Sequence, residues 1–392
     1  MQELKQKFLL DPDIVFLNHG SFGACPRPVF DVYQDWQRRL ERQPVQFLAR
    51  EVYAHLATAR QGLADYLHCA PQDVVYFPNP TTAVNMVARS LDLRPGDEIL
   101  STDHAYGAMD RTWRFICSKT GAHYVQQSMP LPLTTTDAFL ETLWAGVTEH
   151  TRVIFLDHIT SPTALIFPVE EVCHRARQRG ILTIIDGAHA PGHVPLDLTT
   201  LGADIYVGAC HKWLCAPKGS AFLYARREVQ SLLEPLVVSW GYDNPTYDTG
   251  HSFINQHEWQ GTRDIAAFLS VPAAIRFQVE HDWHNVRTRC RALAADTRDR
   301  INALTGLSPL CPDSPLWFRQ FFTARLPAVD VVALKARLYD TYHIEVPVFH
   351  WRDQPLIRVS VQGYNTSQDT DALLAALMAL LPPGLCKQGK QC

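Results

Sequence analysis

The sequence predicts an α/β protein that combines a large domain, built on a mostly parallel sheet, with a smaller α+β domain at the C-terminal end. The chain has 392 residues, a length that suits one large domain and one smaller one. Through its middle, apolar strand-like runs alternate with helix-like segments, and this alternation ends near Ile275. We therefore expect an N-terminal arm over residues 1–20, the large domain over 21–274 and the small domain over 275–392.

Short apolar runs predict the strands of the large domain. They lie at Val74–Phe77, Glu98–Thr102, Arg152–Asp157, Ile181–Asp186, Asp204–Gly208 and Ser220–Ala225. Apolar residues at helical spacing predict helices that begin at Pro80, at about Tyr106 and at Glu170. Continuous apolar strands separated by helices indicate a mostly parallel sheet that is covered on both faces.

The C-terminal part follows a different pattern. A polar segment from Arg276 to about Leu304 predicts one long helix. Strand-like segments follow at 317–326, 343–349 and 355–361. A last amphipathic helix is expected over Gln368–Leu381, and we expect the tail after Gly384 to be frayed. This mixture of strands and helices predicts the α+β character of the small domain.

The composition disfavours several classes of protein. The formal net charge is −4, so the basic excess of a nucleic-acid-binding protein is missing. No apolar run approaches the roughly 18 residues of a membrane span, and the N-terminus shows no signal-like apolar region. The ten cysteines include no Cys-x-x-Cys and no zinc-finger spacing. We therefore expect reduced thiols, no metal, no nucleic-acid or membrane partner, and a cytoplasmic location.

Charged side chains lie where apolar strands are expected to end. In parallel sheets, ligands bind outside the carboxyl ends of the strands. Asp157 and Asp186 each end a strand, and Lys212 follows the strand that ends at Gly208. A carboxylate there needs a cationic or hydrogen-bonding partner, such as the protonated ring nitrogen of a pyridoxal cofactor. The alternatives are that Asp186 caps the next turn and that Lys212 is a solvated surface residue.

Two further places in the sequence favour anions. A helix is expected to begin at Pro80, and the free N–H groups of its first turn, with the hydroxyls of Thr81 and Thr82, suit a phosphate. The alternative is that Thr81 is a simple N-cap. Arg358 lies inside an apolar strand pattern. A buried arginine needs an anion, either the carboxylate of an amino-acid substrate or a partner in an internal ion pair.

Five short motifs together carry a resemblance to a known family. They are N-x-T-T-A at Asn79–Ala83, D-H-x-Y-G at Asp103–Gly107, D-G-A-H at Asp186–His189, H-K-W at His211–Trp213 and Q-G-T-R-D at Gln260–Asp264. From about Phe16 to about Asn365, the chain resembles the class V aminotransferase family of fold-type I pyridoxal enzymes, and within it the isopenicillin N epimerase-like branch. The resemblance implies the fold-type I architecture, a sheet of the seven-stranded type, and pyridoxal 5′-phosphate as the cofactor.

The resemblance implies a catalytic role for three residues. Lys212 would bind the cofactor covalently as a Schiff base, and its freed amine would act as general base at the α carbon of an amino-acid substrate. Asp186 would pair with the pyridine nitrogen. His189 would contact the ring face or the phenolic oxygen.

The resemblance also implies the residues around the cofactor ring and the substrate. Tyr106 would stack on the ring, with His104 as the alternative if the alignment shifts, and Ser161 would contact the phenolic oxygen. The residues expected around the substrate are Arg358, at its α-carboxylate, and Asn18 and His19, in an N-terminal loop.

The phosphate contacts implied by the resemblance come from several segments. They are Thr81, Thr82, the backbone N–H of Ala83, His211 and, across a homodimer interface, Thr262. Ala209 departs from the family pattern, because many members have a polar residue there. That change removes one expected phosphate contact.

The step that follows α-proton removal separates the candidate functions. Loss of a β-substituent makes the protein a C–S lyase that acts on a cysteine conjugate or its sulfoxide, and this is the reaction we expect. Reprotonation on the opposite face makes an epimerase or racemase, which needs a second acid. Candidates for that acid are His19, His158 and Tyr242. Protonation on the cofactor makes an aminotransferase.

Two other functions are disfavoured. A persulfide-forming desulfurase needs a mobile cysteine shortly before the carboxylate-binding arginine, and no cysteine lies between Cys311 and Cys386. A non-catalytic binding protein on the same fold would have no need for the intact set of Lys212, Asp186 and Arg358.

Overall fold

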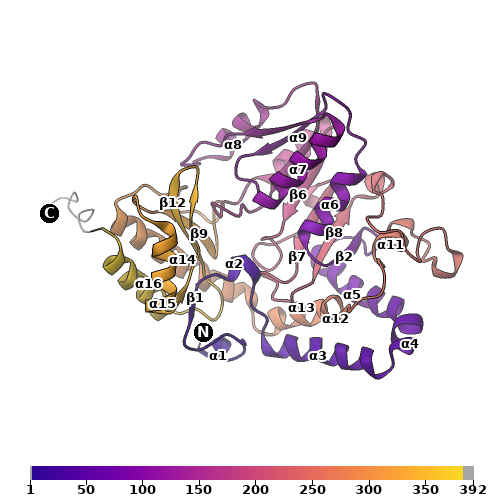
Figure 1. The fold of residues 1–392 in the computed structure, drawn as a ribbon, viewed down its shortest axis with the longest axis horizontal. Coiled ribbons are helices and arrows are strands. Elements are labelled where there is room, and N and C mark those ends of the chain that lie inside the picture. The colour runs from indigo at the N-terminus through magenta and orange to yellow at the C-terminus, as the bar shows by residue number, and fades with distance from the viewer. Residues whose placement is uncertain (1, 383–392) are drawn as a thin grey trace.

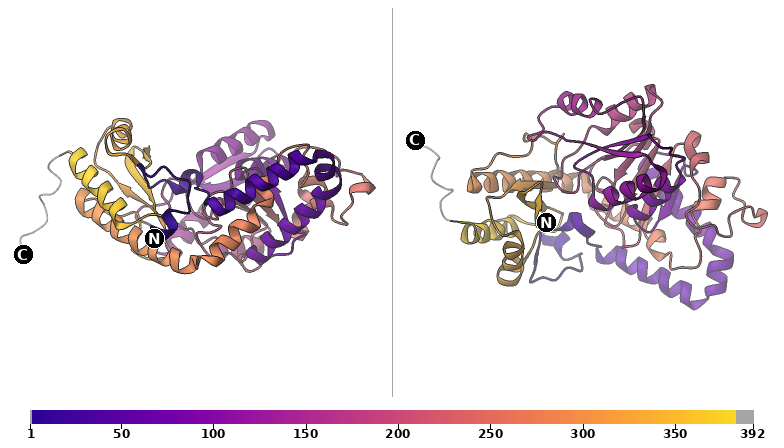
Figure 2. Two further views of the ribbon diagram at one scale, coloured as in Figure 1. Left: turned by 90° about the horizontal axis from the view of Figure 1, so that it is seen from below. Right: turned by 45° about the horizontal axis from the view of Figure 1, so that its top comes forward.

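The chain forms two lobes that lie side by side, with the larger lobe containing the earlier part of the sequence (Figures 1 and 2). The structure is a computed structural model that describes residues 2–382. The tail after Gly384, which we expected to fray, lies outside the described residues. Over residues 2–382, none of the helices is both long and apolar enough to cross a lipid bilayer.

The larger lobe is built on a seven-stranded sheet with the strand order β2-β8-β7-β6-β5-β3-β4. Its strands are β2 (Val74–Phe77), β3 (Glu98–Thr102), β4 (His123–Gln127), β5 (Thr151–Asp157), β6 (Leu182–Gly187), β7 (Ile205–Ala209) and β8 (Ala221–Ala225). Only β8 runs antiparallel to its neighbours, and the remaining pairs are parallel. The predicted mostly parallel sheet is thus confirmed. The polar edge strand β4 was not predicted, because it lacks an apolar run.

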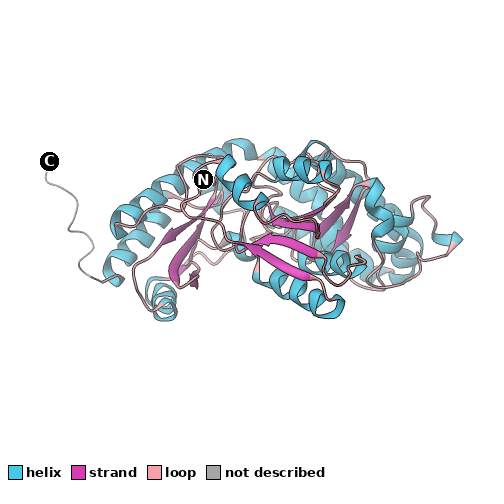
Figure 3. Ribbon diagram, turned by 90° about the horizontal axis from the view of Figure 1, so that it is seen from above, coloured by secondary structure: helices cyan, strands magenta, loops and turns pink. Residues whose placement is uncertain are grey.

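Helices cover both faces of this sheet, as Figure 3 shows. Along β5, Val153 and Phe155 pack on one side, while Ile154 and Leu156 pack on the other. The first side is covered by α6 (Pro80–Ser90), α7 (Gly107–Thr120) and α11 (Ser252–His257). The second is covered by α5 (Val52–Leu67), α8 (Thr136–Trp144), α9 (Val169–Gln178), α12 (Ala266–Leu269) and α13 (Val271–Glu280). Burial on both faces explains why these strands read as continuous apolar runs.

The smaller lobe contains an antiparallel sheet with the order β11-β12-β9. Its strands are β9 (Phe321–Arg325), β11 (Val348–Trp351) and β12 (Gln354–Ser360), and its helices are α14 (Trp283–Thr305), α15 (Val331–Tyr342) and α16 (Ser367–Leu380). The single helix predicted over 276–304 was wrong, since α13 ends before α14 begins. Asp282 adopts a left-handed conformation with φ +49°, and its side chain accepts from the backbone N–H of Asn285, which starts a new helix.

The N-terminal arm is fixed to the smaller lobe. Its strand β1 (Val15–Phe16) pairs in parallel with β10 (Ile344–Glu345). The next residues form α2 (His19–Phe22), which lies between the two lobes (Figure 1). The other short elements of the chain are α1 (Gln2–Lys5), α4 (Pro44–Gln46) and α10 (Leu198–Leu201), and the long helix α3 (Arg27–Arg42) follows the arm.

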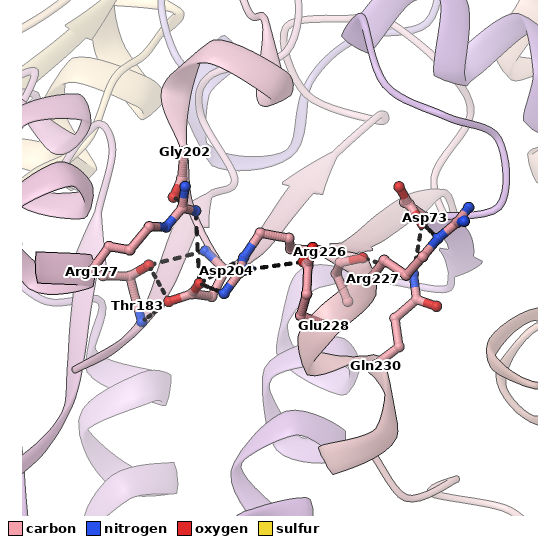
Figure 4. Close-up of polar contacts among 10 residues, drawn as sticks. Asp73, Arg177, Thr183, Gly202, Asp204, Arg226, Arg227, Glu228 and Gln230 are labelled. Atoms are coloured by element: carbon pink, nitrogen blue, oxygen red, sulfur yellow. Dashed lines mark hydrogen bonds and ion pairs between the residues drawn. The ribbon is translucent and has the colours of Figure 1, made fainter. Parts of the chain in front are cut away.

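An ion pair between a buried Asp204 and a half-buried Arg226 lies at the end of the sheet opposite the strand carboxyl ends (Figure 4). Asp204 precedes β7, and its Oδ2 accepts from the backbone N–H and the hydroxyl of Thr183 in β6, at 2.8 and 3.0 Å. Arg226, which follows β8, donates to Oδ1 from Nε at 3.0 Å and from Nη2 at 2.7 Å. These bonds connect three neighbouring strands at one end of the sheet. The polar side chains at the opposite end are therefore not needed to hold these strands together.

Histidine burial predicts how stability depends on pH. His193 is buried, donates from Nδ1 to the carbonyl of His189, and accepts the backbone N–H of Gln320 at Nε2, so it must be neutral. Burial lowers its pKa from 6.5 to about 3. The unfolded chain therefore binds more protons below pH 6.5, and the free energy of unfolding falls as pH drops. One such histidine contributes up to about 1.4 kcal/mol per pH unit.

We expect His193→Gln to show a shallower loss of stability between pH 6.5 and pH 5, measured by urea unfolding at several pH values. The exposed His150→Gln is the matched control and should keep the wild-type slope. An unchanged slope in His193→Gln would contradict the neutral assignment.

Candidate active site

A cavity of about 140 Å³ opens at the carboxyl ends of β5, β6 and β7. Seven of the predicted site residues line it, namely Thr81, Tyr106, Ser161, Asp186, His189, His211 and Lys212. Its other lining residues include Ser21, Phe22, Asn79, Met109, Asp157 and Ile159. The position agrees with the rule that ligands of open α/β sheets bind outside the strand carboxyl ends.

Lys212 lies in the connection between β7 and β8, and its amine is buried. Burial lowers the pKa of Lys212 to about 8, against the opposing effect of Asp186. Its Nζ lies 3.3 Å from Nε2 of His189, whose Nδ1 accepts the indole N–H of Trp213 at 3.3 Å. Because Trp213 can only donate, a neutral His189 carries its proton on Nε2 and points it at the amine. This arrangement favours an uncharged, nucleophilic Lys212.

The backbone around Lys212 is fixed by the N-terminal arm. His19 is buried beneath the turn, with Nε2 donating to the carbonyl of Lys212 at 3.0 Å and Nδ1 accepting the hydroxyl of Tyr364 at 3.0 Å. Asn18 donates to Glu345 at 2.8 Å. The structure therefore places neither Asn18 nor His19 in the cavity, and His19 instead supports the lysine backbone.

The start of α6 borders the cavity. Asn79 caps the helix by accepting the backbone N–H of Thr82 at 2.8 Å, and it also accepts the Thr82 hydroxyl at 3.1 Å. Thr81 faces the cavity, while Ala83 is buried within the first turn. His211 also lines the cavity and donates from Nδ1 to the carbonyl of Ser220 at 3.0 Å. Of the expected phosphate ligands, Thr81 and His211 are thus the two with side chains at the cavity.

Arg358 is buried without a carboxylate partner. It donates from Nη1 to the carbonyl and hydroxyl oxygens of Ser161, at 2.7 and 3.0 Å, and from Nη2 to the hydroxyl of Ser21 at 2.9 Å. No ion pair of Arg358 occurs within residues 2–382, and its Nε has no hydrogen-bond partner there. Burial lowers the pKa of Arg358 to about 10. A guanidinium in this state is ready to bind an anion, so the predicted alternative of an internal ion pair is not formed.

Tyr106 and His104 occupy different places. Tyr106 lines the cavity and is 46% exposed. His104 is buried outside the cavity, where its Nδ1 bonds with the hydroxyl of Thr163 at 2.7 Å and its ring packs against Trp351. Thr262 is exposed and does not line the cavity of its own chain.

A second hollow of about 520 Å³ adjoins the cavity and shares Tyr106 and Ser161 with it. Phe349 and Trp351 of β11 form its apolar wall. At its rim, Arg352 forms an ion pair with Asp103 and so connects the two lobes. Arg358 also lines this hollow, which we call the side-chain groove.

Comparisons with known proteins define the family. The family model described as Aminotransferase class-V matches residues 24–373. The chain belongs to the class V aminotransferase family. It is 39% identical to the isopenicillin N epimerase of Amycolatopsis lactamdurans, over 96% of this chain and 97% of that protein. The motif-based identification of both the family and its epimerase-like branch is therefore confirmed, and with it a pyridoxal-phosphate enzyme.

Two other members show the breadth of the family. The chain is 27% identical to a probable chloroplastic L-cysteine desulfhydrase of Arabidopsis thaliana, over 95% of this chain and 84% of that protein. Its fold matches that of the cystine C–S lyase C-DES, solved in complex with its product cysteine persulfide, with a TM-score of 0.81 at 20% identity over 95% and 99% of the two chains. The predicted fold-type I architecture is thereby confirmed.

The contributions of the last two residues of α2 were not predicted from the sequence. Ser21 binds Arg358, and Phe22 lines the cavity although its side chain is exposed. Neither belongs to a motif, because the contact between α2 and β12 forms only in three dimensions. Asp157 had a visible signal, its position at a strand end, but no role was assigned to it.

Gly23 provides a test of the contact between arm and lysine turn. It has φ +71° and ψ 164°, a conformation that only glycine adopts readily. An added Cβ would lie 2.0 Å from the carbonyl oxygen of His211. We expect Gly23→Ala to lower the free energy of unfolding by at least about 2 kcal/mol, from backbone strain plus this overlap.

The matched control is Gly250→Ala, since Gly250 has φ +78° with open space around it. Chemical denaturation should show a clearly smaller loss for Gly250→Ala. Equal losses of unfolding free energy in the two variants would contradict a tight contact between Gly23 and the turn that carries Lys212.

Proposed function

We propose that the protein binds pyridoxal 5′-phosphate covalently through Lys212 and acts as a C–S lyase, which eliminates the β-substituent of a cysteine conjugate or its sulfoxide. The observation that carries the proposal is the buried, carboxylate-free guanidinium of Arg358, which binds Ser161 beside the cavity that holds the buried amine of Lys212 with its lowered pKa. The guanidinium can bind the α-carboxylate of an amino acid, and the amine can accept its α-proton.

The residues present fit the cofactor. The Lys212 amine has a lowered pKa and lines the cavity, as an imine-forming lysine requires. Asp186 supplies a buried carboxyl group for the pyridine nitrogen, and Tyr106 supplies an aromatic face. Thr81 and the start of α6 supply donors for the phosphate, with His211 beside them. Pyridoxal phosphate, when bound, stabilises negative charge at the α carbon of an attached amino acid.

Within this arrangement, the residues of the chain have separate tasks. Arg358 binds the substrate carboxylate and thereby fixes the direction of the Cα–H bond. Lys212 accepts the α-proton at Nζ, and the Nε2–H of His189 orients that atom. The side-chain groove receives the substituent on the substrate sulfur, and its volume suits a bulky one.

The positions of the three predicted second acids support elimination over epimerisation. An epimerase needs a second acid near Cα, and none of the three candidates lines the cavity. His19 binds the Lys212 carbonyl, His158 binds the hydroxyl of Tyr206 at 2.8 Å, and Tyr242 lies on an exposed loop. Elimination needs only a leaving group such as a thiolate. None of the eight cysteines between residues 2 and 382 lines the cavity either, which disfavours a persulfide-forming desulfurase.

Epimerisation is the second candidate, favoured by the 39% identity to an isopenicillin N epimerase over nearly the whole chain. In that case Tyr106 would be the second acid, since it lines both the cavity and the side-chain groove. Its substrate would then be an amino acid with a long side chain.

A panel of S-substituted cysteines and of L- and D-amino acids separates these reactions. We expect release of pyruvate and ammonia from cysteine conjugates, no activity in Lys212→Ala, and a roughly hundredfold loss of kcat/KM in Arg358→Lys, which keeps the charge but loses the bidentate geometry. Cα deuterium exchange with inversion on L-amino acids, with no pyruvate from any conjugate, would establish epimerisation instead.

We also propose that the active protein is a homodimer in which Thr262 reaches the phosphate bound to the partner chain. The support is the family motif Gln260–Asp264, together with the exposure of Thr262 and its absence from the cavity of its own chain.

Thr262→Ala should therefore weaken cofactor binding at least about tenfold, the effect of one lost hydrogen bond to a charged group. Fluorescence titration with pyridoxal phosphate, paired with sedimentation, measures both affinity and assembly. The exposed Thr246→Ala serves as the control. A monomer that binds the cofactor with full affinity would refute the shared site.

A further inference from the structure

Two carboxyl groups lie next to each other at the floor of the cavity. Asp157 ends β5 and Asp186 lies in β6, and the parallel register pairs the two residues directly. Both side chains point to the face of the sheet covered by α6 and α7, as do Phe155 and Ile184 two residues before them. Both also line the cavity. Neighbouring strands are only about 4.8 Å apart, so the two carboxyl groups are neighbours.

The two groups differ in their hydrogen bonds. Asp186 accepts the backbone N–H of Ala188 at 2.9 Å. Asp157 differs, because its Oδ2 is buried and has no hydrogen-bond partner among residues 2–382. Each residue is only 3% exposed. A buried carboxylate oxygen without a donor is costly when ionised, whereas a protonated carboxyl group can itself donate.

The surrounding charges also disfavour two ionised carboxylates. The charged and titratable groups that face Asp157 are Asp186 on β6, Asp110 on α7, Lys212 after β7 and Tyr124 on β4. Only Lys212 among them is basic. Burial, and then the charge of Asp186, raises the pKa of Asp157 well above its usual value, and burial raises that of Asp186 as well. Adjacent buried carboxyl groups of this kind titrate as a pair.

We propose that Asp157 and Asp186 form a dyad that holds one shared proton and releases it when the cationic ring nitrogen of the cofactor docks on Asp186. On release, the O–H bond of the dyad breaks, the electron pair stays on the carboxylate oxygen, and the proton passes to the solvent. The dyad thereby changes from one negative charge to two as it gains a cationic partner. Asp157 is thus a positioning residue that acts through Asp186. This inference rests on the proposed binding of pyridoxal phosphate, and it holds whether the reaction is elimination or epimerisation.

The dyad makes cofactor binding depend on pH in a definite direction. Because binding releases a proton, affinity for the cationic ring rises with pH, by up to about tenfold per pH unit. The rise continues until the dyad is already ionised in the free protein. Asp157→Asn leaves only the Asp186 carboxyl group to bind a proton, so the free variant has fewer protons to release and this dependence becomes weaker.

Calorimetric titration of the full-length, cofactor-free protein with pyridoxine 5′-phosphate tests the proposal. This ligand has the ring nitrogen and the phosphate, but its alcohol cannot condense with Lys212. Titration in buffers of different ionisation enthalpy between pH 5.5 and pH 8 counts the protons released per ligand bound. We expect the wild type to release up to about one proton more than Asp157→Asn. Both proteins meet the same ligand, so its own ionisations cancel in the difference.

Asp110→Asn is the matched control. Asp110 also faces Asp157, but its carboxylate already accepts the Tyr124 hydroxyl at 2.7 Å and the Gln126 amide at 3.0 Å. Its removal should leave the proton release in place. Equal proton counts in the wild type and Asp157→Asn would overturn the dyad while leaving the cofactor assignment intact. A wild type that fails to bind pyridoxine 5′-phosphate at all would overturn the cofactor site itself.

Infrared difference spectroscopy of the wild type provides a test that requires no variant, in case Asp157→Asn does not fold. With ¹³C-labelled aspartate, the carbonyl band of a protonated carboxyl group should be present before ligand addition and lost on binding of pyridoxine 5′-phosphate. A spectrum without that loss would overturn the proposal.

Discussion

The site around Lys212 is organised by one constraint. Its buried amine needs polar neighbours in place of water, but these neighbours must not hold the amine in its protonated form. The carboxyl groups at the ends of β5 and β6 supply negative charge. The neutral rings of His189 and His19 contact its side chain and its backbone carbonyl. Because His19 is held in place by the Tyr364 hydroxyl of the smaller lobe, the chemistry of one lysine depends on the assembly of both lobes.

In the proposed function, substrate specificity and the reactivity of Lys212 arise in different parts of the molecule. The groups that make Lys212 reactive lie on the sheet, whereas Arg358 and the apolar wall of the side-chain groove belong to the smaller lobe. Two serines connect the regions, since Ser21 and Ser161 both accept hydrogen bonds from Arg358. Substitutions in β11 would therefore change which side chains are accepted without touching the amine. Such a division suits a family in which one cofactor serves several reactions.

Much of the fold could be predicted because its central strands are buried on both faces and so appear as apolar runs. The edge strand β4 was not predicted, because its half-buried polar residues form no apolar run. The boundary between α13 and α14 was not predicted. Asp282 interrupts the helix through its left-handed backbone conformation, and aspartate is not a residue type that by itself excludes a helix. For the site, the family resemblance gave seven of the residues that line the cavity, and the strand-end position of Asp157 was visible, but no sequence spacing indicated that His19 would turn away from the cavity.

The pairing of β1 with β10 sets a condition on the order of assembly. Residues 15 and 16 pair with residues 344 and 345, which lie far from them in the sequence. The support of His19 for the Lys212 carbonyl depends on this closure. The central sheet contains neither of these strands, but the lysine site is complete only when β1 is paired with β10.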